Sequence, residues 1–436
     1  MSKQTIIKGT VILTITGILT KCLGFYNRIF LTRLIGVKEL GTYQLIFPLY
    51  ILGISFCAQG VATSVTKHVS YLLGKQDERN AKRVFYFGVA LSFCLSLLVS
   101  YVLYRFCHGI AANILKNTDC TGLLHILSFA IPFVALKACI NAYFMGYSKP
   151  GYSGTCQLIE QIIRIGSAYV LSVSYMQGDI SARLAVYAVV IGEIGATVYA
   201  CCCYLLFTRR HPVNKTIKKK KIRKDMLQDI IPITSNNVMF TLFSSYEAII
   251  LPAYLFRFYG NNGAAMEMYG IITGIIIPFL LFPSTITNSL SSMLLPSISY
   301  ASAKKDTSAI KKALLSSAFF AVLLGLCACI FYGLFGEFLC TFAFKSKDAG
   351  ILLREMGFLC PLIYLSTTLS SVMNGIGLAF PNLLYHIAGI TIRILSIVLL
   401  VSSVGIPAYI GGMAVSYLLH NVLTLFHLYR HLVKIK

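Results

Sequence analysis

The stretch Thr10–Ile35, TVILTITGILTKCLGFYNRIFLTRLI, decides the fold class. It is long and apolar enough to cross a bilayer as a helix, and yet Lys21 and Arg28 lie within it. Small, polar and cationic residues recur through it in steps of four and three, at Thr10, Thr14, Gly17, Lys21, Gly24 and Arg28. This spacing places them on one face of a helix. Since a charge inside hydrocarbon almost always faces protein or water, we expect that face to line a cavity.

The whole chain has the composition of a polytopic helical membrane protein. Of 436 residues, 57% are hydrophobic and 12% are charged, where about a quarter is usual. The alternation typical of a membrane β-barrel is absent, so the predicted class is an all-α membrane protein with about twelve transmembrane helices. The predicted spans are 6–35, 42–72, 83–108, 121–146, 153–176, 183–208, 227–257, 268–299, 309–333, 350–376, 382–404 and 407–430. The first is interpreted as an uncleaved span rather than a signal peptide.

In a soluble protein, a formal net charge of +23 would indicate a nucleic-acid partner. In this chain, basic cytoplasmic loops explain the charge. The distribution of Lys and Arg predicts both termini on the cytoplasmic side, and no nucleic-acid partner. The run 209–225, RRHPVNKTIKKKKIRKD, is the one obvious linker. It separates a bundle over 1–208 from a bundle over 226–436, and it either anchors the topology or contacts anionic membrane lipids.

The two halves carry an internal repeat. The Ser-Tyr, Lys, Asp and basic-pair residues of 70–83 recur at 299–312, each 229 positions later. A second echo follows the fourth span of each half, where Gly146, Pro150 and Arg164 recur as Gly377, Pro381 and Arg393. Each half holds about six spans, an even number, so the copies share one orientation. Parallel repeats of this kind are a transporter design.

Six cations are predicted to bind an anionic substrate such as a phosphate or pyrophosphate, because guanidinium groups hold these oxygens in pairs. They are Lys21, Arg28, Arg33, Lys67, Arg164 and Arg393. For Arg33 the alternative is a side chain that extends to the membrane surface. Arg393 has no acid one turn earlier, so we expect it to need a counter-charge, which the substrate would supply.

Three acids within spans are predicted to serve in coupling or gating: Glu160, Glu193 and Glu247. Glu160 lies one turn before Arg164, and the alternative is an ion pair within the helix. Glu193 stands beside Gly192 and Gly195, where close helix packing with one buried polar bond is the simpler account. Glu247 is expected to pair with Arg28 across the halves.

Two further predicted spans carry polar stripes typical of moving gates. Span two has Ser55, Gln59, Thr63 and Thr66, and span eight has Thr285, Asn288 and Ser292 with Pro278, Pro283 and Pro296. No nucleotide loop, catalytic triad or metal motif occurs, so we expect no enzyme, no metal and no cofactor. Most of the 14 cysteines lie in apolar runs and are interpreted as small hydrophobic residues. Energy is expected from a proton or sodium gradient, the membrane potential or the substrate's own gradient.

Three stretches resemble stage V sporulation protein B-like polysaccharide biosynthesis membrane proteins, of the multidrug/oligosaccharidyl-lipid/polysaccharide exporter superfamily. They are LGFYNRIFLTRLIGVKELGTYQLIFPLY (23–50), EQIIRI (160–165) and GIIIPFLLFPSTITNSLSSMLLPSISYA, within 269–301. The resemblance implies two six-helix bundles around a central V-shaped, cationic cavity. It also matches Arg28 and Arg33 to first-helix arginines of the family, and Glu160 and Arg164 to its fifth-helix pair.

The resemblance implies an exporter or flippase of an undecaprenyl-pyrophosphate-linked glycan across the cytoplasmic membrane by alternating access, acting as a monomer. Relatives of this kind often carry two further C-terminal helices that form a groove for the lipid tail, and this chain ends after about twelve. A cation-coupled multidrug antiporter and a non-transporting scaffold for cell-envelope synthesis are the alternatives. An antiporter of this superfamily usually has an acid in its first helix, and span one has none.

Overall fold

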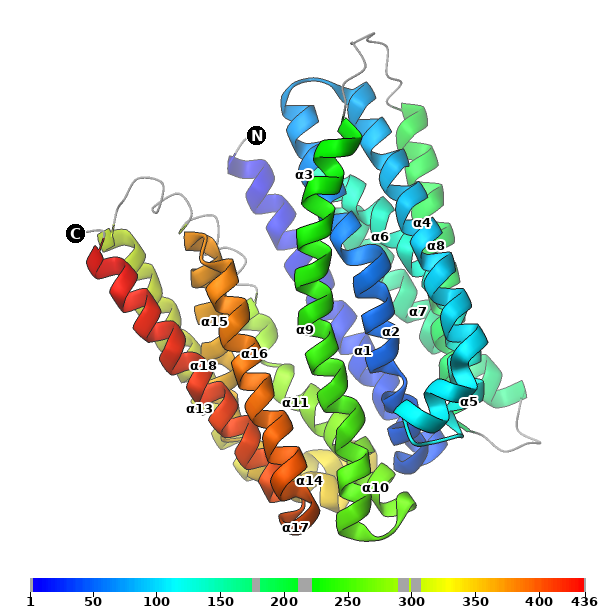
Figure 1. Ribbon diagram of the computed structural model, residues 1–436, viewed down its shortest axis with the longest axis vertical. Coiled ribbons are helices and arrows are strands. Elements are labelled where there is room, and N and C mark those ends of the chain that lie inside the picture. The colour runs from blue at the N-terminus through cyan, green and yellow to red at the C-terminus, as the bar shows by residue number, and fades with distance from the viewer. Residues whose placement is uncertain (1–2, 175–180, 211–221, 289–297, 299–306, 435–436) are drawn as a thin grey trace. The chain divides into compact units, whose positions relative to one another are not determined.

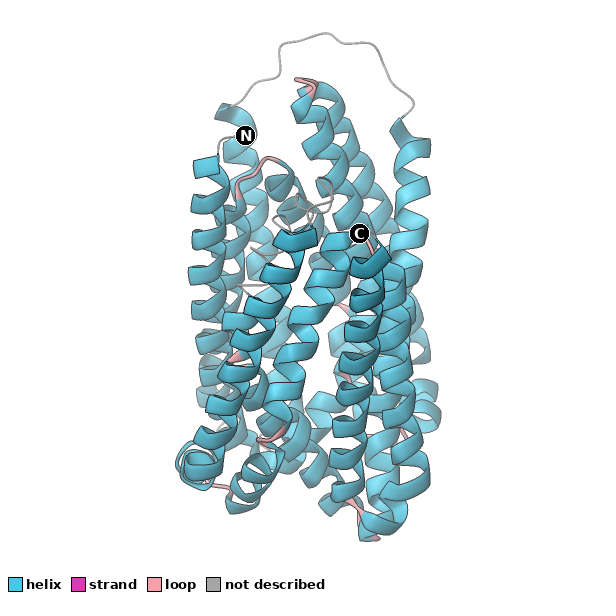
Figure 2. Cartoon of the chain, turned by 90° about the vertical axis from the view of Figure 1, so that its left-hand side faces the viewer, coloured by secondary structure: helices cyan, strands magenta, loops and turns pink. Residues whose placement is uncertain are grey.

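A computed structural model describes residues 3–174, 181–210, 222–288, 298 and 307–434. The described part is almost entirely helical, with short turns between the helices (Figure 1, Figure 2). The chain forms two compact units, Met1–Ser245 and Tyr246–Lys436. The all-α membrane fold that the composition predicts is confirmed.

The described residues of unit 1, Met1–Ser245, form nine helices or parts of helices and two π-helical turns, in which one extra residue enters the backbone spiral. In chain order they are α1 Lys3–Leu45, α2 Phe47–Ile54, a π turn Ser55–Gln59, α3 Gly60–Gly74, α4 Glu78–Gly109, a π turn Ile110–Ile114, α5 Cys120–Ser128, α6 Ala130–Gly146, α7 Pro150–Ser174, α8 Ala182–Arg210 and the first part of α9 Ile222–Tyr259.

Unit 2, Tyr246–Lys436, begins inside α9. Its other described elements are α10 Asn262–Tyr269, a π turn Gly270–Ile276, α11 Ile277–Leu281, α13 Thr307–Phe344, α14 Lys347–Met356, α15 Leu359–Ile376, α16 Ala379–Ser396, a π turn Ile397–Val401, α17 Ser402–Val404 and α18 Ile406–Lys434. The predicted boundary at 209–225 lies largely outside the described residues, and the domain division at that place stays a prediction.

The helices follow the predicted spans. Within the described residues, nine helical stretches are long and apolar enough to cross a membrane, or ten if α5 and α6, bent by 41°, form one span. One of these stretches, Ile15–Leu73, contains two predicted spans, and Gly36 breaks its helix with a φ of +79°. α7 is 25 residues long but is not among them, because Gln157, Glu160, Gln161 and Arg164 lower its mean hydropathy.

The predicted spans leave 334–349 as a connection, but most of it is helical, because α13 continues to Phe344 and α14 begins at Lys347. Two glycines explain the tight hairpin. A Cβ on Gly350 would lie 2.6 Å from the Cα of Glu337, and one on Gly336 would lie 3.3 Å from the backbone nitrogen of Arg354. Without side chains at these points the two helices pack directly against each other.

Local signals set several other helix ends. The side chain of Asp77 accepts a hydrogen bond from the backbone nitrogen of Asn80 at 3.2 Å and so caps the start of α4. Gly377 ends α15 in the left-handed region, with φ +92°. Pro278 lies at the start of α11, directly after the π turn Gly270–Ile276, and the helix ends just before Pro283. A kink at either proline stays a prediction. Ser292 and Pro296 lie outside the described residues.

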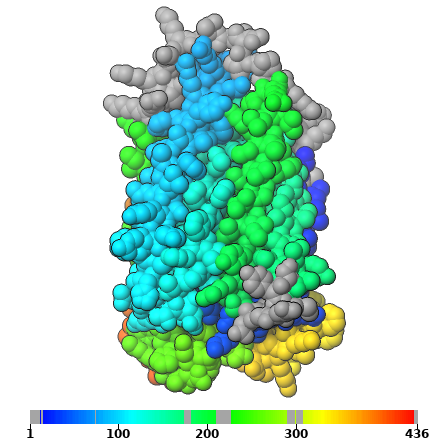
Figure 3. All heavy atoms as spheres, turned by 90° about the vertical axis from the view of Figure 1, so that its right-hand side faces the viewer, coloured from blue at the N-terminus to red at the C-terminus, as the bar shows by residue number. Residues whose placement is uncertain are grey.

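The core of unit 1 is aromatic. Phe85 of α4, Tyr143 of α6 and Tyr204 of α8 form mutual ring contacts with centroids 4.7–5.4 Å apart. The outer face of α4 is apolar as well, with Phe93, Leu97 and Tyr101 exposed. In the space-filling view α4 (blue to cyan) forms a continuous column on one face of the unit (Figure 3). An apolar column that is not covered by protein suits contact with lipid.

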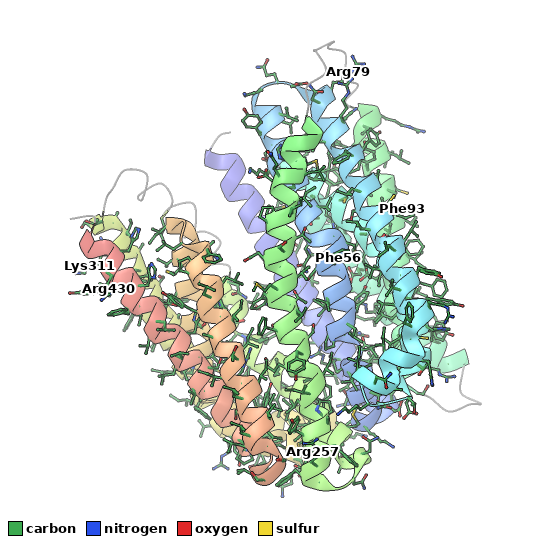
Figure 4. The ribbon with its side chains drawn as sticks, in the orientation of Figure 1. Phe56, Arg79, Phe93, Arg257, Lys311 and Arg430 are labelled. Atoms are coloured by element: carbon green, nitrogen blue, oxygen red, sulfur yellow. The ribbon has the colours of Figure 1, made fainter. Side chains whose placement is uncertain are left out.

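In unit 2 three exposed basic residues lie at the two ends of the helices. Lys311 at the start of α13 and Arg430 near the end of α18 lie at one end of the unit, and Arg257 of α9 lies at the other end (Figure 4). Antiparallel helices of membrane-spanning length produce this separation.

The crossing of α13 and α15 gives a test of the packing. A Cβ on Gly325 would lie 2.4 Å from the Cα of Pro361, so Gly325→Ala forces the helices apart. We expect it to cost about 1–3 kcal/mol of stability, measured as a lower thermal-unfolding midpoint in detergent. Gly333→Ala, on the same helix with nothing within 4 Å of the added carbon, is the matched control. Equal midpoints for the two variants would contradict this packing.

Candidate functional site

Four charged side chains meet inside unit 1. Lys137 comes from α6, Glu160 and Arg164 from α7, and Glu193 from α8. The ammonium nitrogen Nζ of Lys137 lies 2.6 Å from Glu160 Oε2 and also donates to Glu193 Oε2. Arg164 Nη2 lies 2.5 Å from Glu160 Oε1 and 3.4 Å from Glu193 Oε1. Each carboxylate therefore bridges both cations.

Glycines on α8 bring this network together. A Cβ on Gly192 would lie 3.1 Å from Arg164 Cβ, and one on Gly195 would lie 2.5 Å from the Cδ1 of Ile163. The close packing of α7 and α8 expected from these glycines is confirmed. The single buried polar bond expected for Glu193 is wrong, because the close approach lets its carboxylate reach both Lys137 and Arg164.

The network is electrically balanced. Two cations and two carboxylates cancel, and their side chains are only 7–16% exposed. Charges taken out of water are tolerated in a low-dielectric interior when they are paired in this way. The ion pair within α7 between Glu160 and Arg164 is confirmed, but it is half of a larger arrangement. Lys137 is not among the predicted site residues, although a lysine near the middle of the predicted span 121–146 itself indicates a functional or paired charge.

Unit 2 holds a smaller ion pair. Arg393 Nη2 of α16 lies 3.1 Å from Glu247 Oε2 of α9, and the hydroxyl of Tyr409 on α18 donates to Glu247 Oε1 at 3.4 Å. The guanidinium carbon of Arg393 also lies 5.7 Å from the centre of the Tyr417 ring. Glu247 pairs with Arg393 within unit 2, and its pairing with Arg28 across the halves stays a prediction. The expectation that Arg393 lacks a protein counter-charge is wrong, because Glu247 supplies it.

Arg164 and Arg393 occupy equivalent places in the predicted repeat, and both are bound by glutamate from another helix. In both arginines the pairing leaves one donor of the guanidinium unused. The Nε atom of each guanidinium is buried and has no hydrogen-bond partner within the part of the chain that the structure describes. A buried donor without a partner is costly, so both arginines retain capacity for a further acceptor.

The other predicted cations are distributed over α1 and α3. Lys21 and Arg33 are exposed and Arg28 is half-buried, with Lys21 and Arg28 seven positions apart on one face of α1. Lys67 lies midway along α3, where its Nζ is 2.7 Å from Asp229 Oδ2 of α9. His68 Nε2 lies 2.9 Å from the same oxygen. Asp229 is not among the predicted site residues.

Polar residues of α9, among them Thr234 and Thr241, meet the polar stripe of span two in unit 1. Thr241 Oγ1 lies 2.9 Å from Ser55 Oγ, and Ser55 lies 3.1 Å from Gln59 Oε1. Both Ser55 and Gln59 belong to the π turn that joins α2 to α3. A Cβ on Gly60 would lie 1.9 Å from Thr234 Oγ1, so the absence of a side chain at this position lets α9 pack closely here. A gating role for these contacts stays a prediction.

The chain matches the family model described as "Polysaccharide biosynthesis protein" over residues 6–285. Stage V sporulation protein B of Bacillus subtilis (strain 168) is 25% identical over 432 residues, which covers 96% of this chain and 83% of that protein. The protein of the same organism named lipid II flippase MurJ is 20% identical over 67% of this chain and 57% of its own length.

Solved structures show the same fold. An inward-facing multidrug resistance MATE family transporter of the MOP superfamily superposes with a TM-score of 0.73 at 14% identity, over 95% of each chain. An outward-facing structure described in the same terms gives a TM-score of 0.72 at 15% identity, over 99% of this chain and 96% of its own.

The four-residue network predicts a strong dependence on Lys137. In Lys137→Met two carboxylates share Arg164 alone, and an unpaired buried charge costs about 3–5 kcal/mol. We expect a large fall in the thermal-unfolding midpoint of the purified protein. The double variant Lys137→Met/Glu193→Gln restores the charge balance and should recover part of the loss, whereas Lys311→Met removes an exposed lysine and should change nothing. A wild-type midpoint for Lys137→Met would show that the network does not stabilise unit 1.

Proposed function

Since this chain belongs to the polysaccharide biosynthesis protein family, we propose that it is a membrane transporter that moves an undecaprenyl-pyrophosphate-linked glycan across the cytoplasmic membrane. The substrate class follows from the names of the relatives, one of which is called a lipid II flippase. A peptidoglycan or polysaccharide precursor of this kind has a pyrophosphate between lipid and sugar. The protein must therefore hold an anion while it passes through a low-dielectric region.

One observation carries this proposal. Arg164 and Arg393, at equivalent places of the predicted repeat, are each held inside a helical unit by a glutamate and each keep an Nε donor without a partner among the described residues. A guanidinium offers paired donors that fit phosphate oxygens. The glutamates neutralise the arginines while no substrate is bound, and a pyrophosphate competes with them for the same donors.

Lys21 and Arg28 supply the remaining positive charge of the proposed path. They lie on one face of α1, seven residues apart, in a stretch that otherwise consists of apolar, small and uncharged polar residues. A positive charge within a membrane-spanning stretch is costly in contact with lipid, so these two side chains are expected to face protein or water. We therefore assign them to substrate binding, together with Arg33 of α1 and Lys67 of α3. Glu160, Glu193 and Glu247 release and recapture the arginines as the transporter alternates its access between the two sides.

The orientation that we propose places both termini in the cytoplasm. Basic residues are about three times more frequent in the predicted cytoplasmic segments than in the opposite loops. In unit 2, Lys311 and Arg430 lie together at one end and Arg257 at the other (Figure 4), which agrees with this assignment. Since the precursors are made at the inner face, transport is outward, and the chain acts as a transporter rather than as an enzyme.

Multidrug export is the second candidate, because the solved structures with this fold are described as multidrug resistance transporters. The sequence favours the first proposal. No Asp or Glu precedes Glu39, so the first helix offers no carboxylate for a cationic drug or a coupling ion until its last turns.

Reconstituted vesicles test the proposal. With a fluorescent undecaprenyl-pyrophosphate glycan in the lipid, the wild type should move label across the bilayer and Arg28→Ala should lower this flux about tenfold to a hundredfold. The reason is that a charge-assisted hydrogen bond to the substrate contributes about 1.5–3 kcal/mol. Arg105→Ala, which removes an exposed arginine of α4, is the control for insertion and folding.

Wild-type flux from Arg28→Ala would remove this residue from the mechanism. No flux from the wild type, together with resistance to cationic drugs in cells that express it, would favour the multidrug exporter. No transport of either kind would leave the scaffold hypothesis.

A further inference from the structure

A second polar cluster lies in unit 2, where α15, α16 and α18 pack together. The imidazole rings of His386 on α16 and His420 on α18 face each other, with centroids 4.0 Å apart and planes inclined by 31°. Ser370 Oγ of α15 lies 2.9 Å from His386 Nε2, and Ser366 Oγ lies 2.8 Å from His420 Nδ1. His420 is buried, with 2% of its surface exposed, whereas His386 is half-buried.

Small residues close to the histidines create this contact. A Cβ on Gly389 of α16 would lie 2.8 Å from Ser416 Oγ of α18. Gly389 lies three residues after His386, and Ser416 lies four residues before His420, so the crossing point is one turn from both rings. The two imidazoles are therefore held together by the backbone packing of α16 and α18 and not by their own attraction.

The hydrogen-bond partners of the two imidazole rings are compatible with both the neutral and the protonated ring. A serine hydroxyl can donate to an unprotonated ring nitrogen or accept from a protonated one. Each histidine therefore keeps its hydrogen bond to Ser370 or Ser366 when it gains or loses a proton. Asn382 Oδ1, 3.4 Å from His420 Nε2, accepts from that nitrogen in both states. A carboxylate in place of the serines would hold the proton permanently on the ring.

The surroundings leave imidazole as the proton carrier of this region. No Asp or Glu follows Glu355 in the sequence, so α15, α16 and α18 contain no carboxylic side chain. Other titratable or charged groups on the same two helices are Arg393 on α16, which Glu247 of α9 neutralises, Tyr417 on α18, and Tyr385 with His427, joined by a hydrogen bond of 2.7 Å. α15 contributes hydroxyls and no charge. Two rings at 4.0 Å repel a second charge, so the pair can hold at most one proton.

We infer that His386 and His420 form a single-proton site within unit 2, and that its occupancy is linked to the binding of an anion at Arg393. The link rests on the proposed function, whereas the proton site does not. Arg393 lies seven residues from His386 and so on the same face of α16, two turns away. An anionic pyrophosphate that replaces Glu247 at Arg393 makes the region more negative and draws a proton to the histidines. By reciprocity, a proton on the histidines strengthens binding of the anion.

The site is tested first by itself. NMR of the detergent-solubilised protein labelled with carbon-13 in histidine, with His386→Gln and His420→Asn for assignment, should show one shared protonation step for the two rings. Gln and Asn place an amide where the Nε2 of His386 and the Nδ1 of His420 make their hydrogen bonds. Two independent steps, or no step throughout the range in which imidazoles titrate, would overturn the inference.

The link is tested by binding of undecaprenyl pyrophosphate over a series of pH values. For the wild type we expect the affinity to rise by up to about tenfold for each unit by which the pH falls, the slope for uptake of one proton with the anion. In His386→Gln and His420→Asn the affinity should stay near the wild-type value at alkaline pH. His427→Gln, on the same helix two turns away, is the control and should keep the wild-type slope.

The outcomes separate the two proposals. Binding by the wild type that does not change with pH, or variants that keep the wild-type slope, would overturn the link. Wild-type protein that fails to bind undecaprenyl pyrophosphate at every pH would overturn the proposed function and the link with it, and the NMR titration still decides whether the histidines share a proton.

Discussion

The structure depends on the pairing of charges that lie inside its helical units. Hydrocarbon gives no solvation to an ion, so each cation held there needs a carboxylate at hydrogen-bond distance. Lys137 and Arg164 meet this demand through two shared glutamates, and Arg393 meets it through Glu247. The pairing couples three helices in unit 1 and links α9 to α16 in unit 2. Under the proposed function, an anion that enters the protein competes with these contacts, so that the same groups would serve both stability and transport.

Glycine is the second determinant, because an ion pair between helices needs backbones that approach closely. Gly192 and Gly195 bring α8 to α7 beside Glu193, and Gly389 brings α16 to α18 beside the two histidines. In both units the buried polar side chains therefore lie within about one helical turn of the point where the two helices cross. Small residues at a helix interface let polar side chains find partners in other helices instead of in lipid.

The sequence predicted the helices well and their partners less well. Span positions follow from apolar length, and the pair Glu160–Arg164 follows from its spacing of four, since both are properties of one segment. The pairing of Glu247 with Arg393, and the presence of Lys137 beside Glu193, depend on the rotation and neighbours of separate helices, which no local pattern specifies. The hairpin of α13 and α14 was missed because its glycines are contact points and not loop signals.

The π turns at 55–59 and 397–401 have a consequence for how related sequences are compared. Each turn holds one residue more than an ordinary turn, and one residue corresponds to a rotation of about 100° around the helix axis. Loss of a single residue there would leave a continuous helix but would turn everything beyond it to a different face. A one-residue gap in an alignment at these places therefore marks a change of helix phase, and equivalent faces on its two sides have to be assigned separately.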